Sequence, residues 1–135
     1  MSNLVFAAAV MLVACKQSPA RVEKPSVMLK PGESAEFADG WNVSLNGVTD
    51  DSRCPVNVQC VWQGDALVRI TVWSSGGVVT PGNFPLELHT GVEPRSAVKG
   101  GYRFTLDSLT PAPRAGTSIS QADYRAWISV RYLAD

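Results

Sequence analysis

The feature that most constrains this chain is a two-residue alternation of apolar side chains, which recurs from Ser26 to the C-terminus. Segment 124–132 shows it most clearly, because Tyr, Ala, Ile, Val and Tyr occupy its even positions. Successive side chains of a β-strand point to opposite faces, so such a segment buries one face and exposes the other. The same period recurs in segments 41–45, 66–72, 84–88 and 102–106, and none shows the stripe of an amphipathic helix.

The turn residues support the same class of fold. A chain of 135 residues favours one domain, and its 11 glycines and 9 prolines fall between the alternating segments. Pro31-Gly32 marks one turn, and Asp39-Gly40 is a strong hairpin signal. We predict an all-β domain over residues 26–135, an antiparallel β-sandwich of about seven to nine strands, with a β-barrel as the alternative. A short helical turn at 120–123, capped by Ser120, is expected before the last strand.

The N-terminal segment predicts export and lipidation. The uncharged run Leu4–Ala14 is shorter than the about 20 residues that span a bilayer and matches the hydrophobic region of a signal peptide. Leu12-Val13-Ala14-Cys15 resembles a bacterial lipobox, which implies cleavage before Cys15 and acylation of its thiol. We therefore expect a signal peptide at 1–14, although its first fourteen residues lack the usual Lys or Arg.

The segment after the cysteine predicts a tether. Residues 15–25 comprise the lipidated cysteine and a polar stretch with two prolines, which extends about 33–36 Å over ten residues. The residue after the cysteine is Lys16, whereas an Asp there would resemble an inner-membrane retention signal. By this resemblance, the expected location is the cell envelope, anchored in the outer membrane and facing the periplasm.

The charge balance excludes one class of partner. Twelve basic residues offset twelve acidic ones, with no local cluster of Lys and Arg, so the chain lacks the field that gathers nucleic acid. No Gly-rich segment opens a helix, and Gly76-Gly77 and Gly100-Gly101 are expected to be turns. The expected partners are the membrane, through Cys15, and an envelope protein or polysaccharide, and no cofactor is expected.

Residues 50–65, DDSRCPVNVQCVWQGD, form the most distinctive stretch, which we call the cysteine loop. With Cys15 lipidated, Cys54 and Cys60 form an even pair in an oxidising compartment, which predicts a disulfide. A zinc site is the rival, but His89 is the only histidine available as a further ligand. Calcium at Asp50, Asp51 and Asp65 is a weaker idea, because their spacing matches no EF-hand. We predict no metal.

The cysteine loop also carries a resemblance. Asp51-Ser52-Arg53-Cys54-Pro55, followed by Cys60, Trp62 and Gly64, is similar to the D-S-R-C-P…C-x-W-x-G motif of a family of bacterial exported proteins and lipoproteins. The likeness continues through segment 102–109, the Pro111/Pro113 loop and the strand at Tyr124. It implies export and the fold, and it implies no activity.

The loop has two interpretations. In the first, it is a recognition loop that presents Arg53, Trp62 and Gln63 to a partner, since Trp and Arg are common at binding hot spots. In the second, which we favour, Arg53 pairs with an aspartate or caps carbonyls and Trp62 packs over the disulfide.

Outside the loop, Trp73 and Trp127 lie opposite the apolar stripes of their strands, where they form an exposed binding patch or are covered by loops. Trp41 is expected in the core.

The sequence offers little evidence for a catalytic arrangement of residues. A Ser-His-Asp arrangement would need His89, with Asp107 or Asp123 as its orienter, yet no G-x-S-x-G elbow is present. We expect His89 to be a solvated histidine at a strand end. The predicted function is therefore a lipid-anchored envelope protein that acts as a binding or structural module and not as an enzyme. The alternative is an envelope hydrolase or a protease-inhibitor-like domain that acts through the cysteine loop.

Overall fold

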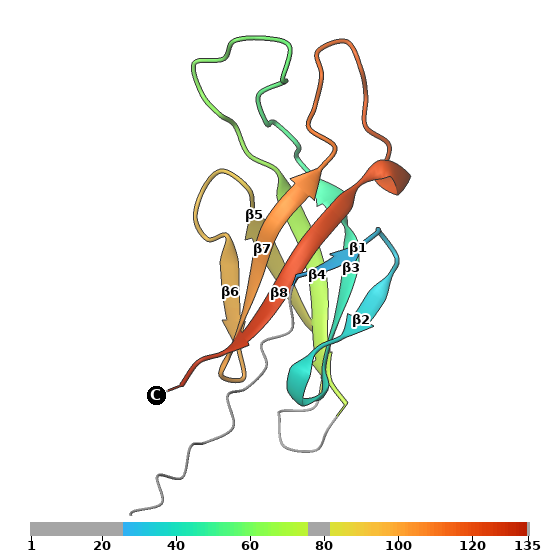
Figure 1. Cartoon of the computed structure of the whole chain (residues 1–135), viewed down its shortest axis with the longest axis vertical. Coiled ribbons are helices and arrows are strands. Elements are labelled where there is room, and N and C mark those ends of the chain that lie inside the picture. Colours follow the sequence, from blue (N-terminus) through green and yellow to red (C-terminus); the bar gives the residue numbers. More distant parts are fainter. Residues whose placement is uncertain (1–25, 76–81, 135) are drawn as a thin grey trace, which may run out of the picture.

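A computed structural model describes residues 26–75 and 82–134, and it is a β-sandwich (Figure 1). Two four-stranded antiparallel sheets have the orders β1-β8-β7-β6 and β2-β3-β4-β5. The predicted all-β sandwich is confirmed, and the sheets do not close into a barrel. The strands are β1 (Val27–Leu29), β2 (Ser34–Glu36), β3 (Trp41–Thr49), β4 (Leu67–Ser74), β5 (Phe84–His89), β6 (Ser96–Lys99), β7 (Tyr102–Thr110) and β8 (Arg125–Tyr132).

The predicted signal peptide, lipid site and tether at 1–25 lie outside the described residues, as does the predicted turn at Gly76-Gly77. Within the described ranges, no helix has the length and hydropathy that crossing a bilayer requires.

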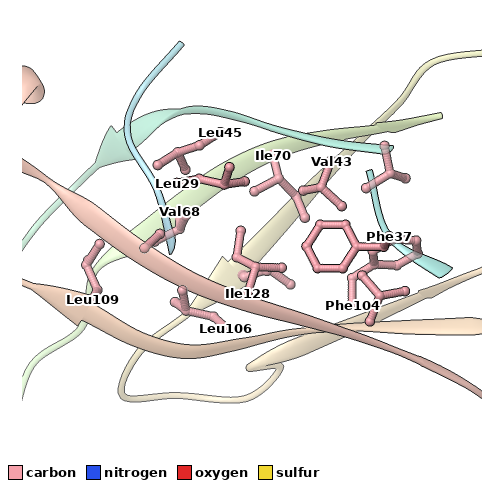
Figure 2. Close-up of a cluster of buried hydrophobic side chains, with 14 of the residues drawn as sticks. Leu29, Phe37, Val43, Leu45, Val68, Ile70, Phe104, Leu106, Leu109 and Ile128 are labelled. Atoms are coloured by element: carbon pink, nitrogen blue, oxygen red, sulfur yellow. The ribbon is translucent and has the colours of Figure 1, made fainter. Parts of the chain in front are cut away.

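The apolar alternation directs one face of each sheet into the core, as predicted. Figure 2 shows side chains of both sheets meeting between the layers, among them Val43, Ile70, Phe104 and Ile128. Trp41 is fully buried, as expected, and its ring centroid lies 5.3 Å from that of Phe104 in the opposite sheet. Fully burying side chains of this size contributes roughly 1.5–3 kcal/mol each, so this layer is the main source of stability.

Two β-bulges explain why the alternation in the sequence stops before the strands do. The register shifts between Leu45 and Gly47 in β3, and between Leu106 and Ser108 in β7. A bulge inserts one extra residue, so the next inward side chain comes three positions later instead of two. Val48 and Leu109 are those next buried residues. Both strands are thereby longer than their sequence pattern indicates.

The predicted turns take different forms. Pro31-Gly32 turns the chain from β1 in one sheet to β2 in the other. Asp39 and Gly40 connect β2 and β3 as a hairpin, with φ of 60° and 76°. A 3-10 turn occupies Gln121–Asp123, but the Ser120 hydroxyl donates to the Asp123 carboxylate and does not cap a backbone amide, so the capping prediction was wrong.

The two long connections lie at the same end of the sandwich (Figure 1). Residues 50–66 link β3 to β4 in one sheet, and residues 111–124 link β7 to β8 in the other. Because the sheets pack face to face, the cysteine loop and the Pro111/Pro113 loop meet there. This end holds the most distinctive residues of the sequence.

Candidate functional site

Cys54 and Cys60 form a disulfide, as predicted. Their Cα atoms are 5.9 Å apart, and the bridge closes the outer part of the cysteine loop. Cys60 is exposed and Cys54 is half-buried, so the bridge lies at the surface and not in the core.

Arg53 fastens the base of the loop to the opposite sheet. Its Nε and Nη2 donate to the two carboxylate oxygens of Asp51 at 2.8 and 2.7 Å. Nη1 donates to the Leu109 carbonyl and Nη2 to the Pro111 carbonyl, both at 2.9 Å. The side chain is only 13% exposed. These contacts match the second interpretation of the loop, in which Arg53 pairs with an aspartate and caps carbonyls, and they turn Arg53 away from any partner.

Asp51 and Tyr124 complete this network. The Tyr124 hydroxyl donates to Asp51 Oδ2 at 2.8 Å. Burial raises the pKa of Asp51, but hydrogen bonds from Arg53 and Tyr124 and the Arg53 charge outweigh it and hold that pKa below its usual value. Burial and the bonded Asp51 carboxylate raise the pKa of Tyr124 to about 12. The carboxylate is therefore held in its charged form, as the hydrogen bonds from Arg53 and Tyr124 require.

Backbone hydrogen bonds hold the loop on both flanks. Within it, the Cys54 amide donates to the Gln63 carbonyl and the Ser52 amide to the Asp65 carbonyl, each at 2.7 Å. Across the gap, the Val56 amide donates to the Pro113 carbonyl at 2.9 Å. The loop is thus tied to itself and to the neighbouring loop along most of its length.

Gly64 makes the close packing of the loop possible. Its φ is +69°, and a Cβ added there would lie 1.8 Å from the Ser52 carbonyl oxygen. Only glycine adopts this backbone conformation without strain and leaves room for that carbonyl. The glycine of the D-S-R-C-P…C-x-W-x-G pattern therefore has a structural reason.

The outer part of the loop exposes four apolar side chains, which we call the apolar tip. Val61 is 92% exposed, Trp62 82%, Val56 60% and Val58 45%. The expectation that Trp62 packs over the disulfide was wrong, because a side chain that is 82% exposed has little of its surface covered by any neighbour. Gln63 is also exposed, beside the tip.

Hydrogen bonds from Asp65 hold the cysteine loop against the β5–β6 connection. Its Oδ1 accepts from the Thr90 and Gly91 amides at 2.9 and 2.8 Å, and its Oδ2 lies 2.5 Å from His89 Nδ1. Burial raises the pKa of Asp65, but the bonds from Gly91, His89 and Thr90 and the His89 charge lower it to about 2. The arrangement that we considered and disfavoured, with Asp107 or Asp123 orienting His89, does not match the structure, because Asp65 is the carboxylate that contacts this histidine. His89 was expected to be solvated, and its side chain is 25% exposed. Asp107 instead accepts from Ser26 and Ser129.

Shallow hollows flank the contact between Gly64 and Gly91. One of about 320 Å³ includes Arg53, Gln63 and Pro113 in its wall, and another of the same volume includes Ser52, Trp62 and Val92. A larger hollow of about 590 Å³ lies on the outer face of β3, β4 and β5, where Arg69 and Glu87 form an exposed ion pair at 3.4 Å. The hollow beside Trp62 is the one that adjoins the apolar tip.

Trp73 and Trp127 do not form a common patch. Trp73 is on β4 and Trp127 on β8, in opposite sheets, and both alternate with buried neighbours. Their side chains therefore face outward on opposite sides of the molecule, which rules out a patch formed by both, one of the two alternatives left open by the sequence. Both are half-buried.

Two of the three carboxylates considered for calcium are engaged by protein donors, and the third, Asp50, is exposed. Asp51 is bonded to Arg53, and Asp65 to His89, Thr90 and Gly91. In the described ranges, no three His, Cys, Asp or Glu side chains converge into a metal-binding group.

Sequence reasoning missed three residues that position the site. Gln121 bonds both backbone groups of Val48, its Nε2 donating at 2.6 Å and its Oε1 accepting at 3.0 Å. Tyr124 was predicted only as a core residue, and Thr90 was given no role. Polar residues just outside strand ends were the available signal, but their partners are far away in the sequence.

Fold and site together define a β-sandwich module with a disulfide-closed loop that is fixed at its base and apolar at its tip. No family model matches the chain, and no curated protein or solved structure matches it either.

Proposed function

We propose that this protein is a lipid-anchored cell-envelope module that binds another envelope component through the apolar tip. This proposal rests mainly on Val61 and Trp62, which are 92% and 82% exposed on a loop whose base is fixed by Arg53 and Asp65 and whose outer part is closed by the disulfide. Exposed apolar groups on a rigid segment support binding, because little conformational entropy is lost when a partner covers them. The exported location rests on the lipobox-like Leu12–Cys15.

The binding role is tested by photo-crosslinking in living cells of the source bacterium. A photoreactive amino acid replaces Trp62 in one variant and Val98 in a matched control, since Val98 is an exposed apolar residue of β6, 53% exposed. We expect a specific protein or lipid adduct from position 62 and none from position 98. Equal or absent adducts at both positions would refute a binding role for the tip.

The anchor has a separate test. Intact-mass analysis of membrane-fractionated protein should show a diacylglycerol-modified Cys15 at the new N-terminus, and Cys15→Ser should release the chain from the membrane fraction. Recovery of an unmodified wild-type chain in the soluble fraction would overturn the anchor and leave the tip unaffected.

The hydrolase alternative has one specific observation in its favour. His89 Nδ1 lies 2.5 Å from Asp65 Oδ2, the arrangement that orients a general base. Turnover of an ester or amide panel that disappears in His89→Ala would establish this alternative. A protease-inhibitor role would instead appear as protease inhibition that is lost in Val61→Asp.

A further inference from the structure

The shape of the apolar tip bears on the kind of partner it fits. Val61 and Trp62 have almost all of their surface uncovered, so they stand out from the molecule. Convex apolar groups suit a soft surface, because binding to a protein would require a pocket of matching shape on the partner. Trp in particular favours the boundary between the headgroups and the acyl chains of a bilayer.

The charge pattern favours the same surface. Residues 54–64 contain no Asp, Glu, Lys or Arg, whereas a chain with 18% charged residues would place about two in eleven positions. Charged residues are costly to move from water toward the hydrocarbon of a bilayer. The neighbouring segment 108–122 has a single charged residue, Arg114, and its side chain is exposed. Segments 54–64 and 108–122 thus combine an uncharged tip with one cation, whereas the charged residues of the cysteine loop lie at its base.

Part of the loop backbone, between residues 54 and 58, already makes its hydrogen bonds within the protein. The amides of Cys54, Val56 and Val58 donate to carbonyls of the protein itself at 2.7, 2.9 and 3.3 Å. Unsatisfied backbone groups are what makes irregular loops costly in lipid. Bonds already made inside the protein reduce this cost at the edge of a bilayer.

We propose that the apolar tip docks on a phospholipid bilayer with anionic headgroups, where Trp62 and Val61 enter the interface and Arg114 contacts lipid phosphate. This inference rests on the proposed role of the tip and names its partner. Val27 pairs with Ile128 near the middle of β8, so the chain enters midway along the sandwich. A ten-residue tether, about 33–36 Å when fully extended, would keep a lipid on Cys15 within that distance of the start of β1. Stable anchoring generally needs more than one membrane contact.

The test uses the full-length chain and vesicles with brominated acyl chains, which quench tryptophan at the interface. Vesicles contain phosphatidylglycerol mixed with phosphatidylcholine, or phosphatidylcholine alone. We expect quenching on the anionic vesicles that is lost in Trp62→Phe and retained in Trp73→Phe. Arg114→Gln should weaken binding to anionic vesicles several-fold and leave binding to neutral vesicles unchanged.

A matched pair of substitutions separates the tip from general apolarity. Val61→Asp should lower binding to the anionic vesicles at least tenfold relative to Val98→Asp, while circular dichroism shows that both variants are folded. Quenching that persists in Trp62→Phe, or equal binding of the two aspartate variants, overturns the lipid proposal. If a protein adduct nevertheless forms at position 62 in cells, the binding function stands and only the lipid partner is wrong.

Discussion

At the residue scale, Arg53 is the clearest case of a side chain whose role only its partners reveal. We predict that Arg53→Ala lowers the free energy of unfolding by about 3 kcal/mol, because it leaves the half-buried Asp51 carboxylate and two carbonyls without a donor. Lys cannot reproduce the two-nitrogen contact with Asp51, so Arg53→Lys should recover only part of this loss. Urea unfolding at pH 7 measures both variants.

The exposed Arg114 is the control for Arg53 at the same end of the molecule. Arg114→Ala should change the stability by less than about 0.5 kcal/mol. An Arg53→Ala variant that unfolds at the same urea concentration as Arg114→Ala would contradict the anchoring role.

The lowered pKa of Asp65 predicts that the free energy of unfolding decreases at acidic pH. Its pKa in the folded protein is about 2, below the usual 3.8, so its ionised form stabilises the fold. This contribution is complete above pH 4 and is lost as the pH falls toward 2. Unfolding curves of wild type and Asp65→Asn should therefore differ most at neutral pH and converge at low pH. A constant difference between the two proteins down to pH 2 would contradict this assignment.

At the scale of elements, the disulfide is predicted to stabilise the cysteine loop more than the sandwich. Replacing both Cys54 and Cys60 by Ala should lower the stability by about 2 kcal/mol, because the bridge closes a short loop. The β-sheet signal in circular dichroism should persist, since no core residue lies in the bridge. Thermal unfolding with and without reductant checks this, and complete loss of the sheet signal would show that the bridge carries the fold.

The elements also show how far a sequence pattern reaches. The alternation predicted strands at 41–45 and 102–106, but both strands continue to Thr49 and Thr110. The bulges shift the inward side chains by one position, and a period-two pattern cannot follow such a shift. The disulfide was predictable because an even pair of cysteines in a domain that is predicted to be exported favours a bridge. The hydrogen bonds between Gln121 and Val48 could not be predicted from the sequence, because the two residues are 73 positions apart.

At the scale of the whole molecule, the stability is concentrated between the sheets. Phe104→Ala should cost about 3–5 kcal/mol, because it opens a cavity at a fully buried position. That is much of the 5–15 kcal/mol of a typical small domain, so a large fraction of the variant should unfold near 37 °C. Trp62→Ala, at the exposed tip, is the control and should leave the midpoint of thermal unfolding nearly unchanged. Equal midpoints for the two variants would contradict this division between core and tip.

The sequence by itself determined the fold class, the inward face of the strands and the disulfide, because period and cysteine pairing are local properties of the chain. Only the tertiary structure decided that Arg53 faces inward, that Trp62 faces outward and that Trp73 and Trp127 lie on opposite faces. Those outcomes depend on which strands become neighbours and on how two loops from different sheets meet. Contacts between distant segments are set by packing, and no local pattern in the sequence encodes them.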